Sequence, residues 1–249
     1  MPTISAILIT RNEERNVADC LAALSWADEI VVLDSYSTDR TVEVCRRFTD
    51  KVHQRTFVNF PTQRNAALEL ATSDWAFFVD ADERVSAERA AEIRAVVSKP
   101  GDNVGYWVPR KNIIWGKWIK GGGWFPDHQL RLLRRGKARY DDAQEVHEVM
   151  RLDGPAGYLK NLLLHYNYQS VRQFLRKQDE YTLLHASTLY HAGTRPRLRA
   201  YITQPARQFL GRYFVRRGYR DGLHGFVLAA LLAYYQFLAH WRLRRLWRR

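Results

Sequence analysis

The 249-residue sequence contains two cysteines, Cys20 and Cys45, and both lie in stretches predicted to be helical. Two such cysteines make neither a disulfide framework nor a metal cluster, which favours a reducing compartment. Residues 1–5 lack a basic stretch followed by a long apolar run, so no signal peptide is expected. Neither G-x-G-x-x-G nor G-x-x-x-x-G-K-[ST] occurs, which removes the main support for a dinucleotide-binding or P-loop protein.

Acidic residues are scarce in the last third of the chain. Residues 170–249 hold 16 of the 39 Lys and Arg but only 3 of the 26 Asp and Glu, so they carry the whole net charge of +13. This asymmetry predicts a neutral catalytic domain at 1–169 and a basic helical region at 170–249 that meets an anionic surface.

The first hundred residues alternate short apolar runs with amphipathic stretches. Strands are predicted at 4–9, 29–33, 52–55 and 75–79. Helices are predicted at 13–24, from the capping residues Thr38 and Asp39 through Cys45, at 62–70 and at 87–97. This order predicts an α/β fold with a mostly parallel sheet wound in βαβ units. Ligands of such sheets gather at the carboxyl ends of the strands, so the polar residues at these ends are the candidate site.

Two carboxylates, Asp80 and Asp82, directly follow the strand predicted at 75–79. At this spacing both can reach one hard cation that also takes diphosphate oxygens. A solvated turn or a helix cap is the plainer interpretation. Asp34 closes the strand at 29–33, where a carboxylate can accept hydrogen bonds from a ribose or a base. Capping of the next helix is the alternative for Asp34.

The ordered motifs resemble family 2 glycosyltransferases with the GT-A fold. The resemblance lies in residues 4–14 (ISAILITRNEE), 30–41 (IVVLDSYSTDRT), 63–67 (QRNAA) and 78–83 (FVDADE), and covers at least residues 3–170. It implies binding of a nucleotide-sugar, by resemblance a UDP-sugar with guanosine not excluded, and of a divalent metal, Mg²⁺ or Mn²⁺. The residues it assigns to the nucleotide-sugar are Thr10, Arg11, Asn12, Glu13, Asp34, Arg64, Asp80 and Ala81.

A narrower resemblance, to the lipopolysaccharide core glucosyltransferase subgroup, follows from residues 121–135 (GGGWFPDHQLRLLRR), 146–148 (VHE) and 164–166 (LHY). It implies that the glycine loop borders the acceptor and that a later histidine completes the metal site. The acceptor residues are then Gly122, Gly123 and Trp124. The metal ligands are Asp82, Asp80 and His165.

The resemblance makes Glu148 the general base. The acidic motif reads His-Glu rather than the commoner Glu-Asp, so Asp127 beside the glycine loop competes for this role. Tyr36 stands where the family usually has glycine, and His165 has the alternative of a satisfied core histidine. A carboxylate that deprotonates the acceptor opposite a stabilised leaving group gives a single displacement, which inverts the anomeric configuration.

The C-terminal region contains a nearly unbroken apolar stretch at 225–241 with arginines on both sides. It is short for a membrane span, and charge on both flanks fits the positive-inside rule poorly. We expect a helix that lies in or dips into the cytoplasmic leaflet of the inner membrane, making the protein peripheral or monotopic. A buried helix or a dimer interface is the alternative, so a homo-oligomer stays open. No nucleic-acid module is found.

The favoured function is therefore an inverting, metal-dependent glycosyltransferase acting on a lipid-linked or lipopolysaccharide-type acceptor. A transferase acting on a polyprenyl phosphate or a polyprenyl-linked acceptor is the second enzyme hypothesis. A membrane-bound scaffold that keeps the fold without turnover is the non-enzyme hypothesis. The sequence does not identify the sugar.

Overall fold

The computed structural model describes residues 1–141 and 150–248, which group into two compact units. Unit 1 comprises Met1–Arg110 and His128–His165, and unit 2 comprises Lys111–Asp127 and Tyr166–Arg249. The boundary expected at residue 169 lies close to the end of unit 1. Residues 111–127, however, group with the C-terminal helices rather than with the sheet.

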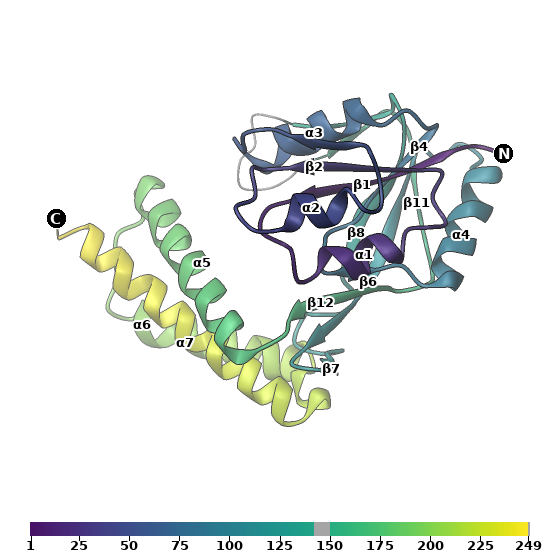
Figure 1. Cartoon of the computed structure of the whole chain (residues 1–249). Helices are drawn as coiled ribbons and strands as arrows, with labels where there is room; N and C mark the ends of the chain where they lie inside the picture. The colour runs from purple at the N-terminus through teal and green to yellow at the C-terminus, as the bar shows by residue number, and fades with distance from the viewer. Residues whose placement is uncertain (142–149, 249) are drawn as a thin grey trace. The chain divides into compact units, whose positions relative to one another are not determined.

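The sheet of unit 1 begins with four parallel strands in the order β3–β2–β1–β4 (Figure 1). These are β1 (Ile4–Thr10), β2 (Glu29–Asp34), β3 (Val52–Gln54) and β4 (Trp75–Phe78). They agree with the predicted βαβ winding. Beyond β4 the sheet is mixed, because β8 (His128–Arg134) runs antiparallel to β4 and β6 (Gly105–Ile114) runs antiparallel to β8.

Short strands complete the sheet pairings of the chain. β11 (Ala156–Tyr158) joins β6 in parallel, and β7 (Lys117–Trp118) pairs with the end of β6 in unit 2. β9 (Ala138–Tyr140) pairs with β10 (Met150–Leu152), and β5 (Glu83–Arg84) pairs with β12 (Leu163–Tyr168).

Helices cover both faces of the parallel strands because alternate strand residues point to opposite sides. Ala6 and Leu8 of β1 face a core formed with α1 (Val17–Ala22), α2 (Thr41–Cys45) and α4 (Ala87–Ser98). Ile7, between them, faces the core formed with α3 (Phe60–Leu70). The strand ends therefore project from a three-layer α/β/α sandwich.

Both cysteines are buried free thiols in this sandwich. Burial raises the pKa of the Cys45 thiol to about 12, with the charge of Asp34 adding to the effect. Burial likewise raises the pKa of Cys20 well above its usual value.

Unit 2 is mainly helical. It consists of α5 (Val171–His191), α6 (Ala200–Leu210), a π-helical turn (Gly211–Val215), a 3₁₀ turn (Gly218–Asp221) and α7 (Leu223–Leu246). Its core joins Ile114 and Ile119 to Phe174 of α5 and to Leu228 and Leu232 of α7.

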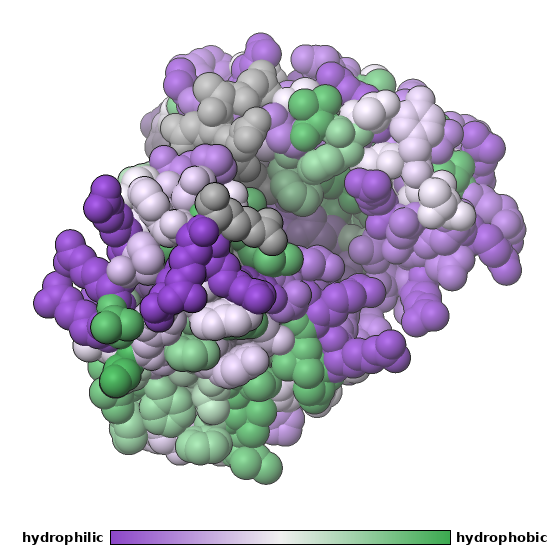
Figure 2. All heavy atoms as spheres, turned by 90° about the vertical axis from the view of Figure 1, so that its left-hand side faces the viewer, coloured by the Kyte–Doolittle hydropathy of each residue, from purple (hydrophilic) through white to green (hydrophobic). Residues whose placement is uncertain are grey.

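The helix α7 is long and apolar enough to cross a membrane by length and composition, and a third of its most apolar segment is buried. Its buried side packs against α5, where the hydroxyl of Tyr235 donates to the carbonyl of Leu175 at 3.0 Å. Large apolar side chains stay exposed on unit 2, among them Ile202, Leu223 and Val215. Figure 2 shows apolar residues gathered at the bottom of the view, over the helical unit.

Candidate active site

The carboxyl ends of β1, β2 and β4 bring most of the predicted nucleotide-sugar residues together in unit 1. Thr10 and Asp34 are register partners at the ends of β1 and β2. Asp80 follows β4, which pairs with the other side of β1. As predicted, the polar residues lie at one edge of the sheet.

Asp34 is completely buried and accepts hydrogen bonds on both carboxylate oxygens. The hydroxyls of Thr10 and Ser37 donate to Oδ1 at 3.0 and 2.5 Å. The backbone N–H of Ser37 and the side-chain amide of Gln54 donate to Oδ2 at 2.8 and 3.3 Å. These bonds satisfy the buried carboxylate and fix its position.

The loop after β1 is held against the loop after β2. Asn12 adopts a left-handed conformation (φ 56°), its N–H donates to the hydroxyl of Ser37 and its Oδ1 accepts from the N–H of Thr38, both at 2.8 Å. Beside it the N–H of Glu13 donates to Thr41 Oγ1 at 2.8 Å, while Arg11 is exposed.

Tyr36, in the loop after β2, is also left-handed (φ 53°), with its ring more than half exposed. The chain thus makes here the turn for which glycine is usual, at the cost of backbone strain.

Asp80 lies in a buried network of alternating charges. Both nitrogens of the Arg131 fork donate to its carboxylate, Nη1 at 3.2 Å, and Arg64 Nη2 lies 3.7 Å from Oδ1. The carboxylate of Glu83 accepts from Arg131 Nη2 at 3.0 Å and from the backbone N–H of Asp80 at 2.9 Å. The network also includes Arg110, 3.5 Å from Glu83.

The network shifts the pKa values of the two carboxylates, Asp80 and Glu83, in opposite directions. Burial alone would raise the pKa of Asp80, but the charges of Arg131 and then Arg64 outweigh it and hold that pKa well below its usual range. Burial raises the pKa of Glu83, and the like charge of Asp80 adds to this; together they outweigh the opposing charge of Arg131. Asp80 is therefore held in its anionic form.

Asp82 and His165 form the pair with the chemistry of a metal site. The antiparallel pairing of β12 with β5 sets His165 opposite Glu83, and its Nε2 lies 3.5 Å from Asp82 Oδ2. Asp82 keeps about a quarter of its side chain exposed, whereas His165 is nearly buried. Ala81, between Asp80 and Asp82 in the sequence, is buried, and its carbonyl accepts from Arg84 at 2.8 Å.

Over the described parts of the chain, no three His, Cys, Asp or Glu side chains gather as a ready metal cluster. The carboxylate of Asp80 is turned to Arg131 and Arg64. Asp82 and His165 offer one carboxylate and one imidazole, a donor set that suits Mn²⁺ or Mg²⁺ if the diphosphate supplies further oxygens.

The predicted acceptor residues lie in unit 2. Gly122 and Gly123 have positive φ of 64° and 82°. Trp124 is half-buried and packs against the core of the unit, with its ring 6.2 Å from that of Tyr168 in edge contact. Asp127 Oδ2 accepts from the side-chain amide of Asn112 at 2.9 Å. Glu148, the other predicted base, lies outside the described residues.

Sequence reasoning missed Arg131, the main partner of Asp80. Its position in an alternating strand, inside the motif HQLRLLR, resembles that of any outward-facing arginine. Only the antiparallel pairing of β8 with β4, Phe77 opposite Leu132, brings it beside Asp80. The polar partners of Asp34, Ser37 and Gln54, were also missed.

Comparison with known proteins agrees with this geometry. The profile described as glycosyl transferase family 2 matches residues 5–166. The chain is 33% identical over 246 residues to the lipopolysaccharide core biosynthesis glycosyltransferase LpsC of Rhizobium meliloti (strain 1021), which covers 94% of this chain and 89% of the relative.

Two solved structures share the fold at low sequence identity. TarS 1–349 of S. aureus in complex with UDP-GlcNAc has a TM-score of 0.52 and 15% identity, covering 99% of this chain and 91% of that chain. Glucosyl-3-phosphoglycerate synthase from Mycobacterium tuberculosis in complex with phosphoglyceric acid has a TM-score of 0.51 and 16% identity, covering 78% and 81%. The predicted GT-A type α/β fold is confirmed. The chain is a glycosyltransferase and belongs to glycosyl transferase family 2.

Proposed function

We propose that the protein moves a sugar from a UDP-sugar to a membrane-linked glycan such as a lipopolysaccharide core, with a divalent metal and inversion at the anomeric carbon. The observation that carries the proposal is the Asp82–His165 pair beside the polar ends of β1, β2 and β4. The UDP-GlcNAc in the TarS structure and the name of the R. meliloti relative support the donor and acceptor classes.

In this proposal, different site residues contact the nucleoside, the diphosphate and the metal. Asp34, fixed by Thr10 and Ser37, accepts hydrogen bonds from the nucleoside, and Arg64 lies on the diphosphate side. Asp82 and His165 would hold the metal, which would neutralise charge on the departing diphosphate. The Arg131 fork holds Asp80 anionic and fixes the turn on which Asp82 sits.

Replacing Asp82 tests the metal assignment. In Asp82→Asn we expect UDP affinity measured by calorimetry with Mn²⁺ to fall roughly 10- to 100-fold, the equivalent of one charge-assisted contact. Without metal the variant and the parent should bind alike. The exposed Asp102→Asn is the matched control. Equal affinity of Asp82→Asn and parent in Mn²⁺ contradicts the assignment.

The general base is either Asp127 or Glu148. Removing a general base lowers kcat by about 10²- to 10⁴-fold while UDP binding persists. We expect one of Asp127→Asn and Glu148→Gln to show this loss and the other to retain most turnover. Near-parental kcat in both, or a product with retained configuration, contradicts a carboxylate base of this kind.

The acceptor class needs a direct assay. Labelled UDP- and GDP-sugars are incubated separately with a lipopolysaccharide acceptor and with a polyprenyl phosphate. Transfer to the first alone supports the proposal, and transfer to the second alone supports the polyprenyl alternative. Binding of UDP with Mn²⁺ but no transfer to either favours the scaffold.

We propose in addition that unit 2 attaches the enzyme peripherally or monotopically to the cytoplasmic face of the inner membrane. The exposed apolar side chains of α6 and α7 and the excess of arginine beside them support this. Basic residues near an anionic leaflet contribute about 1 kcal/mol each.

A further inference from the structure

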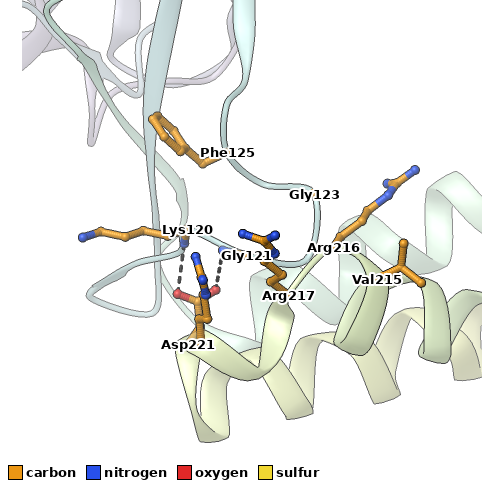
Figure 3. Close-up of a pocket in the computed structure, with 9 residues that line it drawn as sticks. Lys120, Gly121, Gly123, Phe125, Val215, Arg216, Arg217 and Asp221 are labelled. Carbon is orange, nitrogen blue, oxygen red and sulfur yellow. Dashed lines mark hydrogen bonds between the residues drawn. The ribbon is translucent and has the colours of Figure 1, made fainter.

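Unit 2 contains a pocket of about 430 Å³ between the glycine loop and the turns that precede α7 (Figure 3). Four of its lining residues are cationic: Lys120, Arg216, Arg217 and Arg220. All four residues are exposed to solvent.

The walls of the pocket are fixed by hydrogen bonds rather than by the cations. Asp221 is buried and its two oxygens accept from the backbone N–H groups of Lys120 and Gly121, at 3.0 and 2.6 Å. The N–H of Gly122 donates to the carbonyl of Arg216 at 2.8 Å. Asp221, the one acidic residue among those that line the pocket, therefore bonds to backbone N–H groups and does not neutralise the charges of the four cations.

Glycine is required where the loop meets these turns. A Cβ at Gly121 would lie 2.3 Å from the carbonyl oxygen of Arg217. A Cβ at Gly123, which has φ of 82°, would lie 2.8 Å from Arg216 Nη1. The bare loop thus lets a guanidinium group lie directly against its backbone. Arg217 itself adopts a left-handed conformation (φ 56°), a strained geometry that occurs often at binding sites.

The charges at the pocket repel one another. Within residues 1–141 and 150–248, Arg216, Arg217 and Arg220 have no carboxylate at ion-pair distance. Burial, together with the charge of Arg216, lowers the pKa of the neighbouring Arg212. A bound anion with two negative charges would relieve this repulsion, and a phosphate group has that charge and accepts from arginine forks.

One edge of the pocket is apolar. Val215 lines it and is 80% exposed. Phe214, Tyr219 and Leu223, next to it along the chain, are also exposed. A ligand that suits both the cations and this edge carries a phosphate joined to an apolar body.

We propose that this pocket binds the phosphate group of a lipid at the membrane surface, so that the acceptor of the reaction is a phosphorylated amphiphile. The inference rests on the proposed function for the identity of the acceptor, but the phosphate site stands on the pocket alone. Bulk phospholipid is the other source of the same group.

Calorimetry with octyl phosphate, below its micelle concentration, tests the site. We expect saturable binding to the whole protein and a loss of at least about tenfold in affinity in Arg216→Gln/Arg220→Gln. The matched control Arg244→Gln/Arg248→Gln removes two arginines of the same unit outside the pocket and should bind as the parent does. Equal weakening in both variants, or no saturable binding, overturns the proposal.

A second variant and a second probe keep the outcome interpretable. If the double variant melts at a lower temperature, Lys120→Gln decides. The Lys120 side chain is exposed, with Nζ 4.2 Å from the ring centroid of Trp118, so we expect its replacement to leave the melting temperature unchanged. Sugar transfer to the acceptor is then measured in the presence of each competitor. Displacement of bound octyl phosphate by phosphatidylglycerol vesicles, with sugar transfer unaffected by octyl phosphate, identifies bulk lipid as the source of the phosphate and overturns the acceptor assignment. UDP binding with Mn²⁺ in every variant reports the proposed function separately.

Discussion

Glu29, at the start of β2, is a buried carboxylate that stabilises the fold far along the strand from Asp34. It accepts hydrogen bonds from the N–H and the hydroxyl of Thr72, both at 2.9 Å, and from Ser5 and Lys51. Burial alone would raise its pKa, but these partners outweigh burial and lower the pKa from 4.5 to about 2.

The lowered pKa of Glu29 predicts a pH dependence of stability. The folded state binds the proton less tightly than the unfolded state, so the contribution of Glu29 is complete above pH 4.5 and is lost as the pH falls towards 2. The shift corresponds to roughly 3 kcal/mol. We expect Glu29→Gln to lower the free energy of urea unfolding at pH 7 and to flatten its decline between pH 4.5 and 2. An unaltered slope, or the same flattening in the exposed control Glu69→Gln, contradicts this.

At the residue scale, the sequence predicted the residues that end strands but not the residues that bind them. Asp34 and Asp80 follow apolar runs, so their place at the sheet edge follows from the period of the strand. Arg131 reaches Asp80 through the antiparallel β8, a pairing across about fifty residues that no local pattern encodes. Trp124, predicted to border the acceptor, is half-buried and packs against the core of unit 2.

At the scale of the elements, the start of α3 is fixed by one N-cap residue, Asn59. Asn59 accepts from the N–H of Thr62 at 2.9 Å, and Pro61 occupies the first turn, where its missing N–H is not needed. The helix carries Arg64 towards Asp80, so its start sets the position of a site residue.

Removal of this cap should affect both stability and binding. In Asn59→Ala we expect a loss of about 1 kcal/mol in the free energy of unfolding and weaker UDP binding, as measured by denaturation and by calorimetry. Asn59→Ser, which keeps a capping oxygen, should restore most of both. If Asn59→Ala lost stability but kept the UDP affinity of the parent, the start of α3 would have no influence on UDP binding.

Element boundaries were predicted well where capping residues mark them and poorly where tertiary packing decides. Ser170 caps α5 as its predicted start implied. Pro205, a residue that usually interrupts a helix, lies inside α6. Packing on α7 offsets the missing hydrogen bond, with Tyr201 in edge contact with Phe237 at 5.7 Å and its hydroxyl donating to His240.

For the whole molecule, membrane attachment should depend on the exposed apolar side chains of unit 2. Ile202 and Leu223 are 75% and 76% exposed. We expect Ile202→Ser/Leu223→Ser to reduce flotation with phosphatidylglycerol vesicles about tenfold or more, because burial of each such side chain contributes about 1.5–3 kcal/mol. The control is Val58→Ser, an exposed apolar residue of unit 1.

Two outcomes would count against this attachment. Flotation of the double variant equal to that of the parent would exclude the apolar contact. Vesicle binding that does not depend on the content of anionic lipid would exclude the electrostatic contribution to attachment. Release of the parent by a carbonate wash would agree with a peripheral protein and exclude a true span.

The buried thiols give the enzyme a practical property. With their pKa values raised by burial, Cys20 and Cys45 are protonated at neutral pH and shielded from reagents. A cysteine introduced on the exposed face of α6 or α7 would then be the group that reacts with a maleimide dye, without removal of either native thiol. An environment-sensitive fluorophore coupled there would follow lipid insertion in real time on the otherwise unaltered chain.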